Sequence, residues 1–240
     1  MAGLPSEWRS TNTHARPAGG YGRGKGLNMA QILARLLTEF RTRGGTGFAR
    51  FIAARLAQMR SDVLYEIDLT ESNTAPRLPA GLAWVLVDRH SLGSPATCQV
   101  EAEVVTPENH AYRLALQGQD QLLALTDAQG RVRSYGFVIF ESFYKRVLGE
   151  PSSVPMISNC FTFLAERGQG LYPQLLAITC YHLAAKVHRR AIITCAPDNV
   201  ASVRGIEKAG FKRVKTLRSL VLVARWIAWQ HSSAAANTAP

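Results

Sequence analysis

Two hydrophobic periods run along this chain. Apolar residues at three- and four-residue spacing indicate amphipathic helices, whereas alternation of apolar and polar residues indicates strands with one buried face. The first pattern predicts helices over residues 29–40, 48–59, 106–118, 171–188 and 197–210. The second, with short apolar runs, predicts strands over residues 63–69, 82–87, 122–126, 132–140, 156–163, 191–196 and 217–229. Such an order of elements indicates a mixed α/β protein, with loops at 91–103 and 141–155.

The strands at 122–126 and 132–140 form a hairpin signature. Asp127-Ala128-Gln129-Gly130 supplies a short turn between them. Gly136 lies inside the second strand, and a glycine there often marks a bulge or a close backbone approach.

The strand at 156–163 leads into Arg167-Gly168-Gln169-Gly170, and an amphipathic helix follows at once. Glycines let a backbone come close to a ligand, and the first N–H groups of a helix point at an anion with the helix dipole behind them. The order of strand, glycine turn and helix therefore predicts a seat for a pyrophosphate.

A second parallel strand, residues 191–196, follows that helix. Where two parallel strands separate, their backbone N–H and C=O groups are free to pair with an extended ligand. Beside an anion seat, this arrangement suits a long molecule with a pyrophosphate in its middle, and coenzyme A has that shape.

Two motifs give this arrangement a family resemblance. Arg167-x-x-Gly170 is followed, about thirty residues on, by Asn199-x-x-Ser202-x-x-x-x-Glu207-Lys208-x-Gly210-Phe211. Residues 102–225 thereby resemble the GNAT superfamily of N-acetyltransferases. The resemblance implies a mixed, mostly antiparallel sheet with a splayed parallel strand pair and flanking helices. Gly-Leu-Tyr-Pro after the turn and the N-terminal extension are most similar to bacterial proteins encoded with polysaccharide or acyl-transfer functions.

The resemblance also implies a binding site for acyl-CoA, with acetyl-CoA as the first expectation. It places the coenzyme A contacts at Cys160, Phe161, Thr162, Arg167, Gly168, Gln169, Gly170, Leu171, Tyr172, Asn199 and Ser202. Residues 167–172 would hold the pyrophosphate, chiefly through backbone N–H groups, and residues 160–162 would lie along the pantetheine arm. Asn199 also suits a helix N-cap, and Gly210 and Phe211 suit a helix C-cap and a core aromatic.

This chain departs from the family pattern at two positions. Tyr172 stands where the family usually has Gly or Ala, and it is expected to crowd the helix start. Ile206 stands where the family often has a tyrosine that protonates the departing thiolate. Another group or water then supplies that proton, or the protein transfers no acyl group.

A general base must accept the proton of the attacking amine. Glu141, at the end of the hairpin strand, is the first candidate because that strand borders the acceptor site in the family. His110 and Tyr144 are the alternatives, and a surface carboxylate is the alternative reading of Glu141. Glu166 would repel phosphates, so we expect it to pair with Arg167 or to point away.

The remaining segments set the domain organisation. Residues 1–27 are predicted to be a disordered basic tail, with an RNA-binding arm as the alternative, and residues 231–240 a second disordered tail. Residues 28–100 form a helical and strand extension, and residues 101–230 the acyltransferase domain. The basic helices of the extension either pack on the protein or lie on a membrane surface.

Net charge and cysteine spacing limit the partners, metals and cellular location that we expect. Twenty-eight Lys and Arg against 17 Asp and Glu give a net charge of +11, which suits an anionic partner or membrane surface. The four cysteines lack zinc-ligand spacing, so no metal is expected. With no signal segment and no apolar run of about 20 residues, we expect a cytoplasmic protein.

Three functions remain open at this point. The first is transfer of an acyl group, acetyl above all, from acyl-CoA to an amine or a hydroxyl by direct attack. The second is transfer of a long acyl chain from acyl-CoA or acyl carrier protein, with Phe137, Phe140, Phe143 and Phe161 along a tunnel. The third is a non-catalytic module that binds coenzyme A or nucleic acid. The sequence leaves the acceptor and the oligomeric state open.

Overall fold

The computed structural model describes residues 57–70, 74–105, 110–222, 225–227 and 233–234. The predicted tail at 1–27 lies outside these residues, as do the predicted helix at 29–40 and most of the one at 48–59. The predicted disordered tail at 231–240 is described at 233–234, which form the strand β9. The end of the second predicted helix is wrong, because Ala57 to Met59 open the strand β1 (Ala57–Asp68). The apolar spacing in this segment is compatible with either structure, and pairing with two neighbouring strands decides for the strand.

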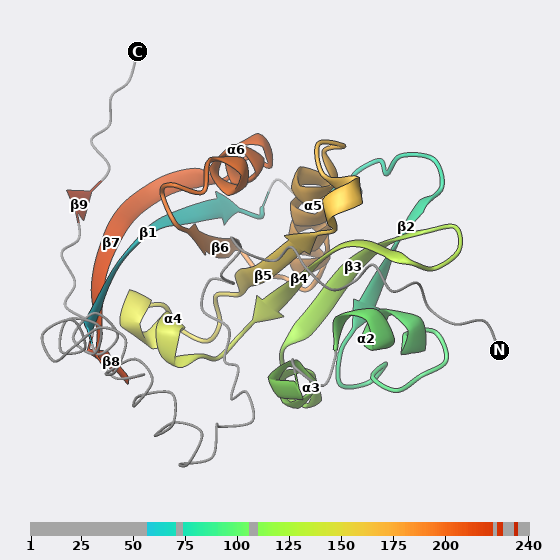
Figure 1. The fold of residues 1–240 in the computed structure, drawn as a ribbon, viewed down its shortest axis with the longest axis horizontal. Helices are drawn as coiled ribbons and strands as arrows, with labels where there is room; N and C mark the ends of the chain where they lie inside the picture. Colours follow the sequence, from blue (N-terminus) through green and yellow to red (C-terminus); the bar gives the residue numbers. More distant parts are fainter. Residues whose placement is uncertain (1–56, 71–73, 106–109, 223–224, 228–232, 235–240) are drawn as a thin grey trace, which may run out of the picture.

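One mixed sheet contains the described strands, in the order β2-β3-β4-β5-β6-β1-β7-β8, with β9 paired to β7 (Figure 1). The bounds after β1 are β2 Leu82–Val87, β3 Gln121–Asp127, β4 Val132–Ile139, β5 Met156–Thr162, β6 Arg190–Cys195, β7 Lys212–Leu222, β8 Arg225–Ile227 and β9 Ser233–Ala234. Neighbouring strands are antiparallel except β5 and β6. The predicted mixed, mostly antiparallel sheet is thus confirmed.

Helices cover both faces of the sheet (Figure 1). Their bounds are α2 Cys98–Val104, α3 His110–Gln117, α4 Phe143–Leu148, α5 Leu171–Ala185 and α6 Val200–Lys208, with a 3-10 turn at Leu164–Glu166. The core between α5, α6 and the sheet includes Leu175, Leu176 and Ile193. On the opposite face, α2 and α3 cover one apolar cluster and α4 covers another, which contains Leu64 and Met156.

β1 lies between β6 and β7; it pairs with β6 over residues 63–68 and with β7 over residues 57–66. Val63, Leu64 and Tyr65 are each 1–2% exposed, because one face of the strand meets the α5 side and the other meets α4. The predicted extension at 28–100 therefore contributes β1 at the middle of the sheet and β2 at its edge.

Two helices lie where the sequence pattern predicted loops. In α2, the carboxylate of Glu101 accepts hydrogen bonds from the Thr97 hydroxyl and the Gly93 N–H, both at 2.7 Å. In α4, the Ser142 side chain accepts from Lys145 N–H, and Gly149 ends the helix in the left-handed region at φ 76°. Both helices are too short for a periodic apolar pattern, so local caps are their main sequence signal.

Candidate functional site

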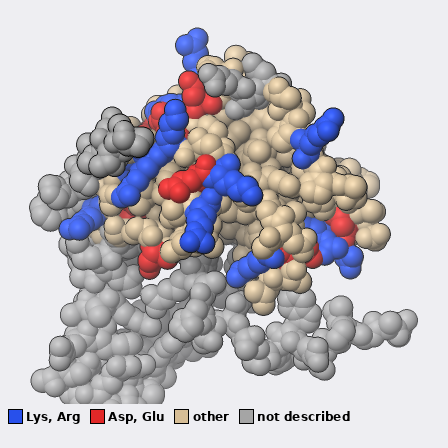
Figure 2. Space-filling model, turned by 90° about the horizontal axis from the view of Figure 1, so that it is seen from above, with Lys and Arg blue, Asp and Glu red and all other residues tan. Residues whose placement is uncertain are grey.

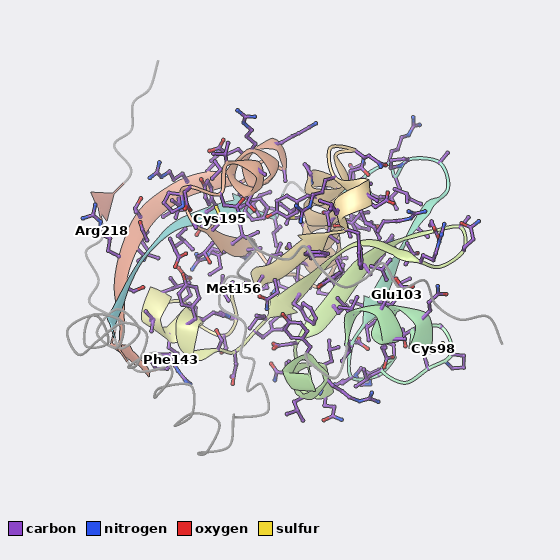
Figure 3. All side chains as sticks on the ribbon, in the orientation of Figure 1. Cys98, Glu103, Phe143, Met156, Cys195 and Arg218 are labelled. Carbon is purple, nitrogen blue, oxygen red and sulfur yellow. The ribbon has the colours of Figure 1, made fainter. Side chains whose placement is uncertain are left out.

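β5 and β6 separate soon after they meet. They pair at Met156 with Ile192 and at Ile157 with Ile193, and Ile192 N–H donates to the Pro155 carbonyl at 3.1 Å. Beyond that point residues 158–162 of β5 have no strand partner on the β6 side. Figure 3 marks Met156 near the junction and Cys195 at the end of β6. The splayed parallel pair that the sequence predicted is therefore present.

A bulge in β5 lies at the same level. The register between β4 and β5 shifts between Tyr135 and Phe137, opposite Asn159, whose φ is 50°. Gly136 sits at the shift, and a Cβ there would lie 2.9 Å from the Cys160 sulfur. Gly136 thus marks both a bulge and a close approach, as its position in the strand predicted.

The bulge sets the directions of the side chains that follow it. Cys160 points toward α5, and its thiol has a pKa raised to about 12 by burial. Phe161 lies on the opposite face, where it is 37% exposed and its ring centroid is 5.7 Å from that of Tyr135. The Thr162 hydroxyl bonds to Ser134 at 2.9 Å. Of these three, Phe161 presents an exposed aromatic surface.

The glycine turn has the backbone that an anion seat requires. Gly168 and Gly170 have φ of 82° and 73°, and Gly170 caps the N-terminus of α5. Added Cβ atoms would meet nothing within 4 Å at either position, so positive φ alone demands glycine there. The N–H groups of Gly168, Gln169 and Gly170 have no acceptor among the described residues.

Side chains around the turn leave its N–H groups accessible. Arg167 is exposed, donates Nε–H to the Thr162 carbonyl at 3.3 Å and places its guanidinium 5.9 Å from the Phe161 ring centroid. Gln169 donates to the Ala165 carbonyl at 3.4 Å. Leu171 is buried, so only its backbone faces the turn. An anion at this turn would meet backbone donors, with the exposed cation of Arg167 nearby.

Glu166 does not pair with Arg167. Its carboxylate forms an ion pair with Arg133, which also reaches Asp127 at 2.6 Å. Arg133 lies on the neighbouring strand β4, a partner that only tertiary structure supplies. The charge of Glu166 is thereby neutralised beside the turn. Hydrogen bonds from Arg131 and Arg133 hold the pKa of Asp127 at about 2, although partial burial opposes the shift.

Tyr172 lies between α5 and α6 rather than over the turn. A Cβ at Gly205 would stand 2.3 Å from Cδ1 of its ring, so Gly205 makes room for it. Its phenol bonds to Ser202, and burial raises its pKa, with Cys160 and Cys195 adding to the shift. The crowding expected at the helix start is therefore relieved on α6, while the phenol faces the diverging strands.

α6 begins as its motif predicted. The Asn199 side chain accepts a hydrogen bond from Ser202 N–H at 3.2 Å and caps the helix. Gly210 follows the helix at φ 91°, and Phe211 is buried in the core. Ile206 is fully buried in the same core, so an apolar side chain suits that position. Asn199 and Ser202 thus have structural roles, and the predicted contacts with coenzyme A stay predictions.

The candidate bases lie in different places. Glu141 is exposed and follows β4 beyond Ile139, which pairs with Met156 at the closed end of the diverging strands. The structure therefore does not bring Glu141 together with the turn. His110 opens α3, and its side chain lies outside the described residues. The hydroxyl of Tyr144 donates to the carboxylate of Asp62 at 3.1 Å.

Asp62 is the acidic residue near the diverging strands that sequence reasoning missed. It is 5% exposed and lies on β1. A signal exists in the sequence: Asp62 and Leu64 share the parity of one strand face, so a carboxylate at 62 occupies a position where the pattern expects an apolar residue.

No group of three or more His, Cys, Asp or Glu suited to a metal occurs among the described residues. Within the same residues, no helix has the length and apolar character needed to cross a membrane. On the face seen in Figure 2, Lys and Arg side chains are spread among acidic and uncharged ones rather than gathered in one patch.

Comparison by sequence finds neither a matching family model nor a matching curated protein. Solved structures do match. A GCN5-related glucosamine N-acetyltransferase region of a fungal multi-domain GH3 β-N-acetylglucosaminidase aligns over 72% of this chain and 22% of its own, with TM-score 0.51 and 14% identity. A Drosophila protein aligns over 77% of this chain and 58% of its own, with TM-score 0.50 and 12% identity. A GCN5-related N-acetyltransferase from Sphaerobacter thermophilus reaches TM-score 0.48 and 16% identity over 87% and 70%.

The match to the N-acetyltransferase region shows the fold. The mixed sheet with its splayed parallel pair and flanking helices is the GNAT fold. The resemblance drawn from the two motifs is confirmed at this level. The narrower likeness to bacterial polysaccharide or acyl-transfer proteins stays a prediction.

Proposed function

We propose that this protein is an acyl-CoA-dependent N-acyltransferase that moves an acyl group, acetyl above all, to an amine by direct attack on the thioester. One observation carries the proposal: β5 and β6 part after two residue pairs, directly beside a glycine turn whose N–H groups lack acceptors. The first feature frees backbone groups for an amide-containing arm, and the second supplies donors for a pyrophosphate.

Residues 158–162 would hold the pantetheine arm, and residues 167–172 would hold the pyrophosphate. The exposed Arg167 would add a charge-assisted contact to a phosphate oxygen. Asn199 and Ser202 would border the arm from α6. These contacts position the thioester, and proximity with backbone N–H donation to its carbonyl oxygen would supply most of the rate.

Protonation of the leaving thiolate needs a group other than Ile206. Tyr172 offers a phenol near Cys160 and Cys195, and its raised pKa keeps it protonated at neutral pH but also makes it a weaker acid than an ordinary phenol. Water is the alternative donor. For the base, Glu141 remains the candidate drawn from the family resemblance, and its replacement by Gln tests it.

Calorimetry with acetyl-CoA and lauroyl-CoA tests the binding step. We expect binding in the micromolar range, and its loss in Gly170→Trp, where the ring would cover the N–H groups of the turn. Gly81→Trp is a matched control because Gly81 has φ 81° and nothing within 4 Å of a Cβ, yet lies before β2. Failure of the wild-type protein to bind any acyl-CoA would refute the proposal.

Transfer of a longer acyl chain is the second candidate. The exposed ring of Phe161 favours it, since an apolar chain would cover that ring. Of the other three phenylalanines, Phe137 is buried in the core and Phe140 packs on His188, whereas Phe143 is 38% exposed on α4. Comparing turnover of acetyl and lauroyl thioesters, from coenzyme A and from acyl carrier protein, separates the candidates.

A non-catalytic module is the third candidate, favoured by Ile206 at the position of the family's acid. Its test is a salt-dependent shift of nucleic acid without cleavage of any thioester. A cytoplasmic location, and an anionic or membrane partner for the basic N-terminal region, belong to the proposal as well.

A further inference from the structure

Asp62 is a buried carboxylate that accepts one side-chain hydrogen bond from the part of the chain that the structure describes. It is 5% exposed, and the Tyr144 hydroxyl donates to Oδ2 at 3.1 Å. Burying a carboxylate is costly unless it is paired, and a phenol compensates less than a cation does. The position therefore calls for a reason other than stability.

The register of the sheet places Asp62 at the open end of the diverging strands. Val63 is the partner of Cys195, the last residue of β6, so Asp62 lies one step beyond the end of β6. The partner of Asp62 on β7 is Leu217, which belongs to the apolar cluster under α4. Its side chain therefore projects from the α4 face of the sheet.

Other polar side chains share this face. Thr194 is the partner of Leu64, and Ser158 is the partner of Phe137, so both project from the side opposite α5. Each lies one residue beyond the last pairs of β5 and β6. Asp62 lies two residues further toward the open end than Leu64, the partner of Thr194. Two hydroxyls and a carboxylate thus follow the line along which the strands part.

Other acidic side chains have different partners or lie elsewhere. Glu66 and Glu150 form ion pairs with Arg190, and buried Glu101 accepts from Thr97 and Gly93 N–H. Glu141 is exposed beyond the closed end of the strands. Among these carboxylates, Asp62 is buried, has a neutral hydrogen-bond partner and lies beyond the C-terminal end of β6, where the strands diverge.

We propose that Asp62 is the catalytic carboxylate that binds the amine of the acceptor and accepts its proton, and that Tyr144 positions it. This inference rests on the proposed acyl transfer. It assigns the acceptor to the α4 face, opposite α5, and its chemical class to amines with a primary nitrogen that is cationic in water, since a buried carboxylate attracts such a group.

The bound ammonium first passes one proton through the Asp62 carboxylate to solvent, which leaves a neutral amine. The amine nitrogen then forms a bond to the thioester carbonyl carbon, and a second N–H proton passes to Asp62. The carbon–sulfur bond breaks, and the coenzyme A thiolate leaves with the electron pair and takes a proton from water, or from Tyr172, which solvent then reprotonates. Asp62 returns its proton to solvent, so the products are an amide, free coenzyme A thiol and one proton.

Two titratable groups lie on the face of Asp62 on neighbouring elements. Tyr144 comes from α4, and Lys215 on β7 reaches the Leu148 carbonyl at 3.3 Å. Cys195 ends β6 but packs with Val63 on the α5 side. Burial raises the pKa of Cys195 to about 11, and Asp62 adds to that shift. Cys195 is therefore a neutral thiol near pH 7.

The test measures thiol release from acetyl-CoA with spermidine, glucosamine, tyramine and lysine methyl ester as acceptors. Asp62→Asn is expected to lower kcat by about 100- to 1000-fold, within the range for loss of a general base, and to bind acetyl-CoA as the wild type does. Asp68→Asn is the matched control on the same strand, because Asp68 is exposed and bonds only to Thr70. It should retain full activity.

The kinetic constants separate a catalytic role from a structural one. Asp62→Asn should lower kcat and leave the KM for acetyl-CoA unchanged. Tyr144→Phe should lower kcat by a smaller factor, again with the KM for acetyl-CoA unchanged, because the carboxylate loses the hydrogen bond that positions it. This second variant also keeps the test alive if Asp62→Asn does not fold.

Three outcomes overturn the inference. Full activity of Asp62→Asn removes Asp62 from the chemistry while leaving the proposed function intact. A large loss in Glu141→Gln with no loss in Asp62→Asn assigns the base to Glu141. A wild-type protein that neither binds acetyl-CoA nor releases thiol with any of the four amines refutes the proposed function, and the inference with it.

Discussion

Gly205 and Tyr172 should be coupled in stability. An alanine Cβ at 205 would lie 2.3 Å from Cδ1 and 2.7 Å from Cε1 of the Tyr172 ring, against 3.4 Å or more for ordinary contact. The ring or the helix must therefore move by about 1 Å. Gly205 is buried, and the ring is held between α5 and α6, so neither moves without disturbing the packing.

The expected magnitude combines two opposing terms. Overpacking in a core costs about 1–3 kcal/mol, and replacing a helical glycine by alanine gains about 1 kcal/mol. Gly205→Ala should therefore lower the free energy of unfolding by up to about 2 kcal/mol. In a Tyr172→Ala background the clash is absent, and the same substitution should stabilise the protein by up to about 1 kcal/mol. The sign of its effect should invert.

Urea unfolding of the four proteins in this double-mutant cycle measures the coupling. For a chain of this size, each kcal/mol also corresponds to a shift in Tm of about 2–4 °C. A stabilising effect of Gly205→Ala in the wild-type background, or equal effects in both backgrounds, would refute the packing of Tyr172 on α6. Tyr172 would then lie elsewhere, and the proposed pyrophosphate site at residues 167–172 would have a different geometry.

Three further outcomes are expected. Asp127 has a pKa of about 2 in the folded state against 3.8 ordinarily, so it stabilises the fold above that range and less as the pH falls from about 4 to 2; in Asp127→Asn, urea unfolding should show a weaker loss of stability over this interval. A thiol reagent at pH 8 should modify exposed Cys98 within the mixing time and the other three cysteines slowly, because burial shields them and raises their pKa to about 11–12; mass spectrometry of peptides distinguishes the sites. Lys145 is 1% exposed and donates to the carbonyls of Phe140, Ser152 and Val154, so Lys145→Met should cost about 1–3 kcal/mol in the free energy of unfolding, and an unchanged midpoint would contradict its role in holding α4.

Much of the sheet was predictable from local pattern. The strand at 82–87 matches β2 residue for residue, and the hairpin of β3 and β4 follows from alternation around a glycine turn. Gly136 predicted the bulge, because a glycine weakens a strand interior and often marks a bulge or a close backbone approach. The glycine turn before α5 was equally predictable, because backbone positions with positive φ favour glycine.

The rest depends on contacts that local pattern does not carry. The last strand was expected at 217–229, yet β7 begins at Lys212 because it pairs with β1 from Glu66 onward. The ion pair of Glu166 with Arg133 on β4 likewise depends on the packing of neighbouring segments and not on local pattern. Asp62 and Tyr144 are 82 residues apart in the chain, and only the fold shows that they meet.

The place of β1 has a consequence for how the protein is made. Its partner Arg190 follows Asp68 by 122 residues, from the register of β1 and β6, and at a synthesis rate of about 5–20 residues per second β1 waits roughly 6–24 seconds for that strand. Throughout this interval a strand of buried character is exposed on the ribosome, where it is open to chaperones and to pairing with other chains. The sheet closes only when β7 arrives, so a ribosome-bound fragment that stops before residue 212 should not yet protect β1 from proteolysis.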